Sequence, residues 1–267
     1  MRTSLLILLV AILNTSCSEY QKVLKGEDVL EKYEMAEKLY EAEKYKKALK
    51  LMEQVVPVYR GKPQAEKLMY MYANTFYQLE DFYLAGYQFE RFETSYPNSD
   101  SVEVAAYRSA RSYYELSPRY SLDQVDTYKG LEKLQEYIDN YPDSELRTEA
   151  NGLVAELRGK LEKKSFEVAK QFFRISDYKA AIESFDNFIT DNPGSSYRKE
   201  AFYGRYEAAY ELAINSLPHL VKERLEKAKE YYNNFTKYYG ESDLKSDADE
   251  ILTDIDKRLA KIVEPTS

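Results

Sequence analysis

The chain has 267 residues and a net charge of −8, with 46 acidic residues against 38 basic ones. Binding to a phosphate backbone needs clustered lysine and arginine, so this acidic chain with dispersed lysines is not expected to bind nucleic acid. The single cysteine and single histidine exclude an internal disulfide and any metal site rich in these residues. No glycine-rich phosphate loop and no metal-ligand spacing occur, so we expect no catalytic residues, no cofactor and no metal.

The first residues have the pattern of an export signal that ends at a lipidated cysteine. A basic start is followed by an apolar run over residues 5–13, which is shorter than the roughly 20 residues that span a bilayer. The segment before Cys17 resembles a lipobox, although Asn14 stands where leucine is usual. We expect a signal peptide over 1–16, lipidation of Cys17 and a lipidated tether over 17–27. The alternative is an ordinary thiol in a cleaved signal peptide.

The rest of the chain repeats a helix–turn–helix pattern. Small residues recur inside the first helix of each predicted pair, at Ala36, Ala73, Ala110, Ala169 and Ala209. Large apolar residues follow each of them, and the second and fourth repeats close with Pro97 and Pro193, as in tetratricopeptide repeats. Such pairs bury their apolar face only by stacking on their neighbours. We therefore expect an all-α fold, an α-α superhelix (solenoid) of about five tetratricopeptide-like helix pairs, rather than an irregular helical bundle.

The spacing of the repeats indicates how the chain is divided. The interval between Ala110 and Ala169 is longer than the others, which leaves room for an insertion near Pro118 and a long helix from about residue 145 to 163. We expect repeats 1–3 over 28–142 and repeats 4–5 over 143–240. A capping helix and tail follow over 241–267, with an apolar stripe from Ile251 to Ile262.

The first helices of the early repeats carry tyrosines in a regular phase. Positions that line the concave face of a tetratricopeptide repeat hold Tyr33, Tyr40, Tyr70, Asn74, Tyr77, Tyr107, Arg111 and Tyr114. Tyrosine offers a large contact area and a hydroxyl, while Asn74 and Arg111 suit the amides or terminal carboxylate of an extended peptide. We interpret these residues as a peptide-binding groove. The alternative is that the tyrosines pack between adjacent repeats with their hydroxyls reaching water.

One stretch carries a resemblance to a known family. Residues 167–173 read Glu-Val-Ala-Lys-Gln-Phe-Phe and are followed by Tyr-Lys-Ala-Ala at 178–181 and Asp-Asn-Pro at 191–193. This run resembles the fourth repeat of the BamD family, which are lipoproteins of the outer-membrane β-barrel assembly machinery. The resemblance extends over about residues 29–239, with two phenylalanines at 172 and 173 in place of the usual tyrosines.

The resemblance implies a non-enzymatic subunit, lipid-anchored on the periplasmic face of the outer membrane. It implies that repeats 4–5 bind a BamA-type barrel protein beside other assembly lipoproteins. It also implies that repeats 1–3 receive unfolded outer-membrane protein precursors, which are extended and rich in aromatic residues. Two alternatives remain open: a repeat lipoprotein that serves as a scaffold in secretin or pilus assembly, and a soluble secreted enzyme or binding protein with Cys17 unmodified.

Overall fold

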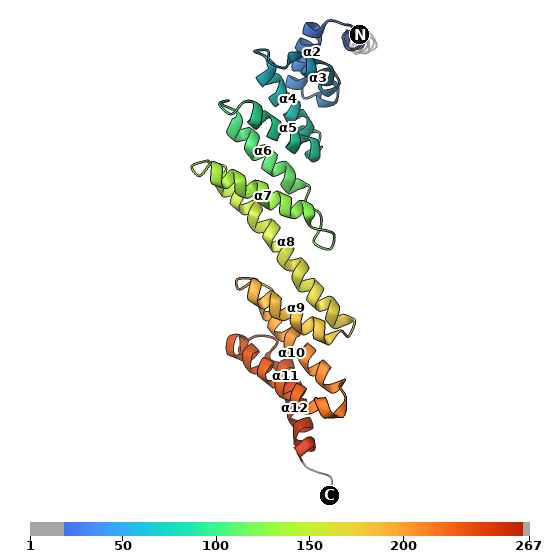
Figure 1. The fold of residues 1–267 in the computed structure, drawn as a ribbon, viewed down its shortest axis with the longest axis vertical. Coiled ribbons are helices and arrows are strands. Elements are labelled where there is room, and N and C mark those ends of the chain that lie inside the picture. Colours follow the sequence, from blue (N-terminus) through green and yellow to red (C-terminus); the bar gives the residue numbers. More distant parts are fainter. Residues whose placement is uncertain (1–18, 264–267) are drawn as a thin grey trace, which may run out of the picture. The chain divides into compact units, whose positions relative to one another are not determined.

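The computed structural model describes residues 19–263, and helices make up most of that range (Figure 1). No strand occurs within it, so the predicted all-α fold is confirmed. The predicted signal peptide over 1–16 and the lipidation of Cys17 lie outside the described residues. None of the helices in the described range is long and apolar enough to cross a membrane.

The helices form two compact units. Within the described range, unit 1 comprises residues 19–118 and 123–157, and unit 2 comprises residues 119–122 and 158–263. Unit 1 contains α2 (Val29–Glu41), α3 (Tyr45–Tyr59), α4 (Ala65–Gln78), α5 (Phe82–Ser95), α6 (Val102–Glu115), α7 (Val125–Asn140) and the first part of α8 (Arg147–Arg174). Unit 2 contains the rest of α8, α9 (Tyr178–Asp191), α10 (Arg198–Ile214), α11 (Pro218–Tyr239) and α12 (Lys245–Val263).

The small residues of the repeat pattern lie where paired helices approach each other. The five alanines of the first helices are 0–3% exposed: Ala36, Ala73, Ala110, Ala169 and Ala209. The second helix of the third pair, α7, has a small residue at its crossing too, Gly130, which the sequence pattern missed. A Cβ at Gly130 would lie 3.1 Å from both the Leu157 Cδ1 and the Tyr113 carbonyl oxygen. The absence of a side chain at this position therefore lets α7 pack tightly against α6 and α8.

Three of the turns inside helix pairs share one backbone conformation. Glu43, Glu80 and Ser176 have positive φ angles of 57°, 60° and 62°, the left-handed region that non-glycine residues seldom adopt. The next residue caps the following helix in two cases, because Asp81 and Asp177 each accept the amide three residues later, at 3.3 and 3.2 Å. The turn geometry is thus repeated although its residues are not glycines.

The predicted long helix is α8, which continues without a break from Arg147 to Arg174. Its early residues Ala150 and Leu157 belong to an apolar cluster of unit 1. Its later residues Phe166 and Ala169 belong to the apolar cluster of unit 2. The helix therefore serves as a packing partner in both units.

Three turns contain a proline followed two residues later by a serine: Pro97 and Ser99, Pro142 and Ser144, and Pro193 and Ser195. The hydroxyls of Ser99, Ser144 and Ser195 accept the amide two residues later, at 3.1, 3.1 and 3.2 Å. The next helices begin at Val102, Arg147 and Arg198, three residues after each serine. The hydroxyl closes the turn and does not cap the first turn of the helix.

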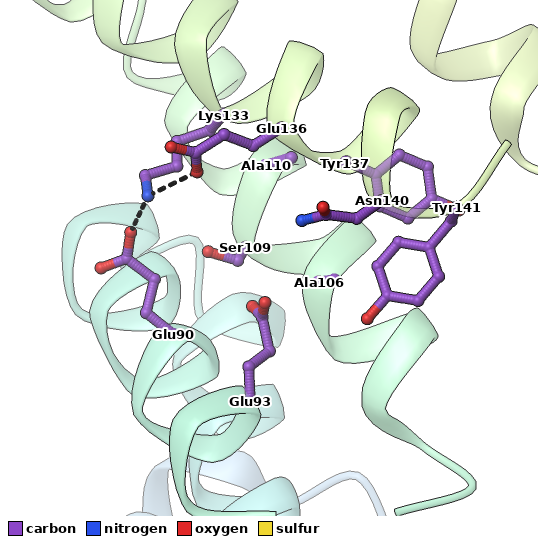
Figure 2. A pocket seen from close by; sticks show the side chains of 10 residues that line it. All are labelled: Glu90, Glu93, Ala106, Ser109, Ala110, Lys133, Glu136, Tyr137, Asn140 and Tyr141. Atoms are coloured by element: carbon purple, nitrogen blue, oxygen red, sulfur yellow. Dashed lines mark hydrogen bonds and ion pairs between the residues drawn. The ribbon is translucent and has the colours of Figure 1, made fainter. Parts of the chain in front are cut away.

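An ionic cluster joins the second helices of repeats 2 and 3 (Figure 2). The Lys133 Nζ of α7 lies 2.8 Å from both the Glu90 Oε1 of α5 and the Glu136 Oε2 of α7. Glu93 lies one turn after Glu90 and lines the same small cavity of about 40 Å³. Burial, reinforced by the neighbouring carboxylates, raises the pKa of Glu93 to about 7, while Lys133 opposes this shift. The cavity therefore favours a neutral carboxyl group at Glu93.

Core packing of unit 1 can be tested at α5. Phe89 is 0% exposed, whereas Tyr83 on the same helix is 69% exposed. We expect Phe89→Ala to lower the free energy of unfolding by about 3–5 kcal/mol, because it removes a buried ring and leaves a cavity. The control Tyr83→Ala should change it by less than about 0.5 kcal/mol. Urea unfolding followed by circular dichroism measures both, and equal losses would contradict the packing described here.

The cavity at Glu93 makes stability depend on pH. The pKa of Glu93 is higher in the folded chain than in the unfolded chain, so protonated Glu93 adds to the free energy of unfolding. This contribution is fully present below a pH of about 4.5 and is lost as the pH rises through about 7. We expect Glu93→Gln to raise the Tm by about 2–4 °C at pH 8 and to change it little at pH 5. The control Glu53→Gln, at an exposed position on α3, should leave the Tm unchanged at both pH values. A gain for Glu93→Gln that is the same at pH 5 and pH 8 would refute the assignment.

Candidate peptide-binding face of unit 1

The residues predicted to form a groove all lie on the first helices of the three pairs in unit 1. Two lie on α2, three on α4 and three on α6: Tyr33, Tyr40, Tyr70, Asn74, Tyr77, Tyr107, Arg111 and Tyr114. Each tyrosine stands three residues before or four residues after a buried alanine of the repeat pattern. On a helix these positions flank the alanine on one face, so the rings are positioned at the edges of the helix crossing.

Asn74 joins the three helices through its side-chain amide. Its Nδ2 donates to the Tyr40 hydroxyl of α2, and its Oδ1 accepts from Arg108 of α6. The Arg108 guanidinium also lies 6.0 and 5.6 Å from the ring centres of Tyr70 and Tyr77. Asn74 is only 5% exposed, and both polar atoms of its side chain are engaged within the chain. Arg108, which the sequence pattern missed, thus organises three of the predicted residues.

Arg111 is held by carboxylates of the same unit. Its Nη1 lies 2.5 Å from the Glu149 Oε1 of α8, and its Nε lies 3.2 Å from the Glu115 Oε1. The same Nη1 donates to the Tyr107 hydroxyl at 3.4 Å, and this contact raises the pKa of Arg111. A ligand carboxylate that approached Arg111 would therefore compete with two carboxylates already present.

Four tyrosine hydroxyls of this face, those of Tyr70, Tyr77, Tyr107 and Tyr114, remain protonated near neutral pH. Burial raises the pKa of Tyr107 to about 12, and it also raises the pKa of Tyr70 and Tyr77. Tyr114 donates to the Glu156 Oε2 of α8 at 2.5 Å, and this hydrogen bond raises its pKa to about 12. These hydroxyls are available only as neutral hydrogen-bonding groups.

A hollow of about 450 Å³ opens on the α2 and α4 side of this face. Tyr40 and Tyr70 line it, together with Glu37, Glu41, Pro63, Glu66, Lys67, Met71, Phe92 and Ser101. The ring of Tyr70 meets Phe89 and Phe92 edge-on, with ring centres 5.9 and 5.5 Å away. Tyr33 does not line the hollow and stacks instead on Tyr59 at 5.1 Å. The predicted residues are thus divided between the hollow and the neighbouring helix crossings.

The rim of this hollow is acidic. Three carboxylates, Glu37, Glu41 and Glu66, line it against a single ammonium group, that of Lys67. Lys67 is itself paired with Glu37. The hollow therefore suits an apolar or aromatic group with neutral or basic neighbours better than a free carboxylate.

A family model and a curated relative match this chain. The family model described as "YfiO: Outer membrane lipoprotein" matches residues 26–219. The outer membrane protein assembly factor BamD of Caulobacter vibrioides is 26% identical over 126 residues, which are 47% of this chain and 41% of that relative. The alignment thus spans less than half the length of the curated relative.

A solved structure of kinesin light chain repeats from Podosopora anserina, described as nearly identical TPR-like repeats, covers 77% of this chain and 95% of its own length. It is 14% identical, with a TM-score of 0.33. The family match extends over the helix pairs of unit 1 and into those of unit 2. The chain therefore belongs to the YfiO family of outer membrane lipoproteins.

Proposed function

We propose that the chain is a non-enzymatic subunit of the β-barrel assembly machinery. It is anchored through lipid at Cys17 on the periplasmic face of the outer membrane. It binds unfolded outer-membrane protein precursors through repeats 1–3 and a BamA-type barrel protein through repeats 4–5. Membership in the outer membrane lipoprotein family and the similarity to a BamD protein support this role.

The observation that carries the precursor-binding proposal is the tyrosine-lined hollow of unit 1. Its volume of about 450 Å³ lies in the range of protein ligand sites, roughly 300–1,000 Å³. Tyr40 and Tyr70 present ring surface and hydroxyls together, which suits an extended chain with aromatic side chains and unpaired backbone amides. The acidic rim disfavours ligands with several carboxylates, so selectivity would come from aromatic content and low negative charge.

Filling the hollow tests this proposal. Ser101 lines it, lies just before α6 and makes no side-chain cap to that helix, so a larger side chain there need not disturb the core. We expect Ser101→Trp to weaken binding of a labelled aromatic-rich peptide from an outer-membrane β-barrel strand at least about tenfold, close to 1.4 kcal/mol. Fluorescence anisotropy measures the affinity. The matched control is Thr94→Trp, at an exposed position on α5 outside the hollow.

Two outcomes would count against the hollow as the binding site. Unchanged affinity in Ser101→Trp with an unchanged circular dichroism spectrum would place the peptide elsewhere. Equal weakening by Thr94→Trp would show that the effect comes from general disturbance of α5 and α6. A peptide with a C-terminal amide should bind at least as tightly as one with a free carboxylate, because the rim of the hollow is acidic and Arg111 already has two carboxylate partners.

The partner and the anchor are tested together by affinity purification of the tagged chain from mildly solubilised outer membranes. We expect a BamA-type barrel protein at near-stoichiometric yield, and we expect Cys17→Ser to release the chain from the membrane fraction. Recovery of a secretin or pilus component instead would overturn the proposed role while leaving the fold and the family unchanged.

A further inference from the structure

Unit 2 contains an apolar hollow of its own. Its volume is about 330 Å³, and it is lined by Phe166, Lys170, Phe173, Arg174, Phe185, Glu200, Tyr203, Gly204, Glu207 and Leu244. Gly204 of α10 lets the Phe185 ring pack directly against the helix backbone, because a Cβ there would lie 2.6 Å from that ring. The rings of Phe166 and Phe185 are nearly fully buried behind it.

Three apolar side chains that line this hollow are partly exposed to solvent. Phe173, Tyr203 and Leu244 pack against the core of unit 2 while remaining partly exposed. Burial raises the pKa of Tyr203 to about 12, so its hydroxyl is neutral and adds no charge to the wall. A space of this kind gains dispersion contacts when an apolar side chain enters it.

The charged groups around the hollow are unequally paired. On the α8 side, Lys170 and Arg174 both contact Glu167, at 3.2 and 3.7 Å. On the α10 and α12 side, Glu207 and Asp247 form no ion pair with any residue in the described part of the chain. Both carboxylates raise the pKa of Tyr203, which places them within electrostatic reach of the hollow.

The environment of Glu207 strengthens this asymmetry. Burial raises its pKa, and the nearby carboxylates of Glu211 and Asp247 raise it further. Glu250 of α12 contributes to the same negative region, as its effect on Tyr203 shows. A cation placed beside these carboxylates would relieve their mutual repulsion, whereas an anion would add to it.

We propose that this hollow binds a large apolar side chain of a partner polypeptide that has lysine or arginine next to it in sequence. The apolar side chain enters between Phe173, Tyr203 and Leu244. The basic neighbour faces Glu207 and Asp247. The proposal gives the C-terminal repeats a chemically defined ligand and rests on the proposed function only for the identity of the partner.

A peptide titration of the full chain tests the proposal. The probe is the acetylated and amidated peptide Gly-Lys-Phe-Lys-Gly, and the comparison peptides replace Lys-Phe-Lys by Glu-Phe-Glu or by Lys-Ala-Lys. With glycine amides and leucine methyl groups labelled for NMR, we expect shifts at Gly204 and Leu244. We expect the first peptide to bind at least about tenfold more tightly than either comparison peptide.

Two double variants that each remove two negative charges test whether binding of the basic peptide depends on the carboxylates beside the hollow or on the net charge of the chain. Glu207→Gln with Asp247→Asn should weaken binding of the basic peptide about tenfold. Glu223→Gln with Glu241→Gln removes the same charge from exposed positions of unit 2 outside the hollow and should not weaken it.

Equal binding of all three peptides, shifts confined to other residues, or equal weakening by both variant pairs would each overturn the proposal. The result is also separable from the test of the proposed function. Recovery of a barrel protein without peptide binding rejects the hollow alone. Peptide binding without a barrel partner rejects the assembly role alone.

Discussion

The structure depends on the close approach of two helices at residues too small to keep them apart. In each described pair the first helix contributes an alanine that is almost fully buried, and the partner helix usually contributes another. Dense packing leaves no room for a larger group at these crossings. The position of each alanine then fixes the rotation of its helix. In unit 1 the tyrosines one turn before and after each alanine lie at the edges of the crossing, and all of them except the buried Tyr107 are partly exposed.

This constraint explains why the tyrosines partly fit both interpretations, packing between adjacent repeats and lining a peptide-binding groove. Rings such as Tyr70 pack edge-on against buried phenylalanines, as expected for residues between repeats. The same rings line a hollow, as expected for a ligand site. In the hollow of unit 1 a ligand would meet polar groups that already have partners, since Tyr40 bonds to Asn74 and Lys67 pairs with Glu37. In unit 2 it would meet carboxylates without cationic partners. The two hollows therefore differ in what recognition must displace.

The sequence predicts the helix pairs, the long α8 and the small residues because each follows from local spacing. It does not predict the polar partners of the groove residues. Arg108 reaches Asn74 across 34 residues, and Glu149 and Glu156 reach Arg111 and Tyr114 across 38 and 42. Such pairs depend on how successive helices are rotated against each other, which no single-helix pattern encodes. Gly130 was missed for a related reason, since its neighbours Tyr113 and Leu157 come from two other helices.

The uninterrupted course of α8 has a consequence for the order of folding. Starting a helix is unfavourable, with a nucleation constant on the order of 10⁻³, whereas each further residue adds a hydrogen bond to an existing end. Residues of α8 up to Leu157 are stabilised by packing in unit 1. The segment that carries Phe166 and Ala169 can then extend from a turn already formed and need not nucleate on its own. Unit 1 thereby acts as a template for the first helix of unit 2, which favours folding from the N-terminal repeats onward.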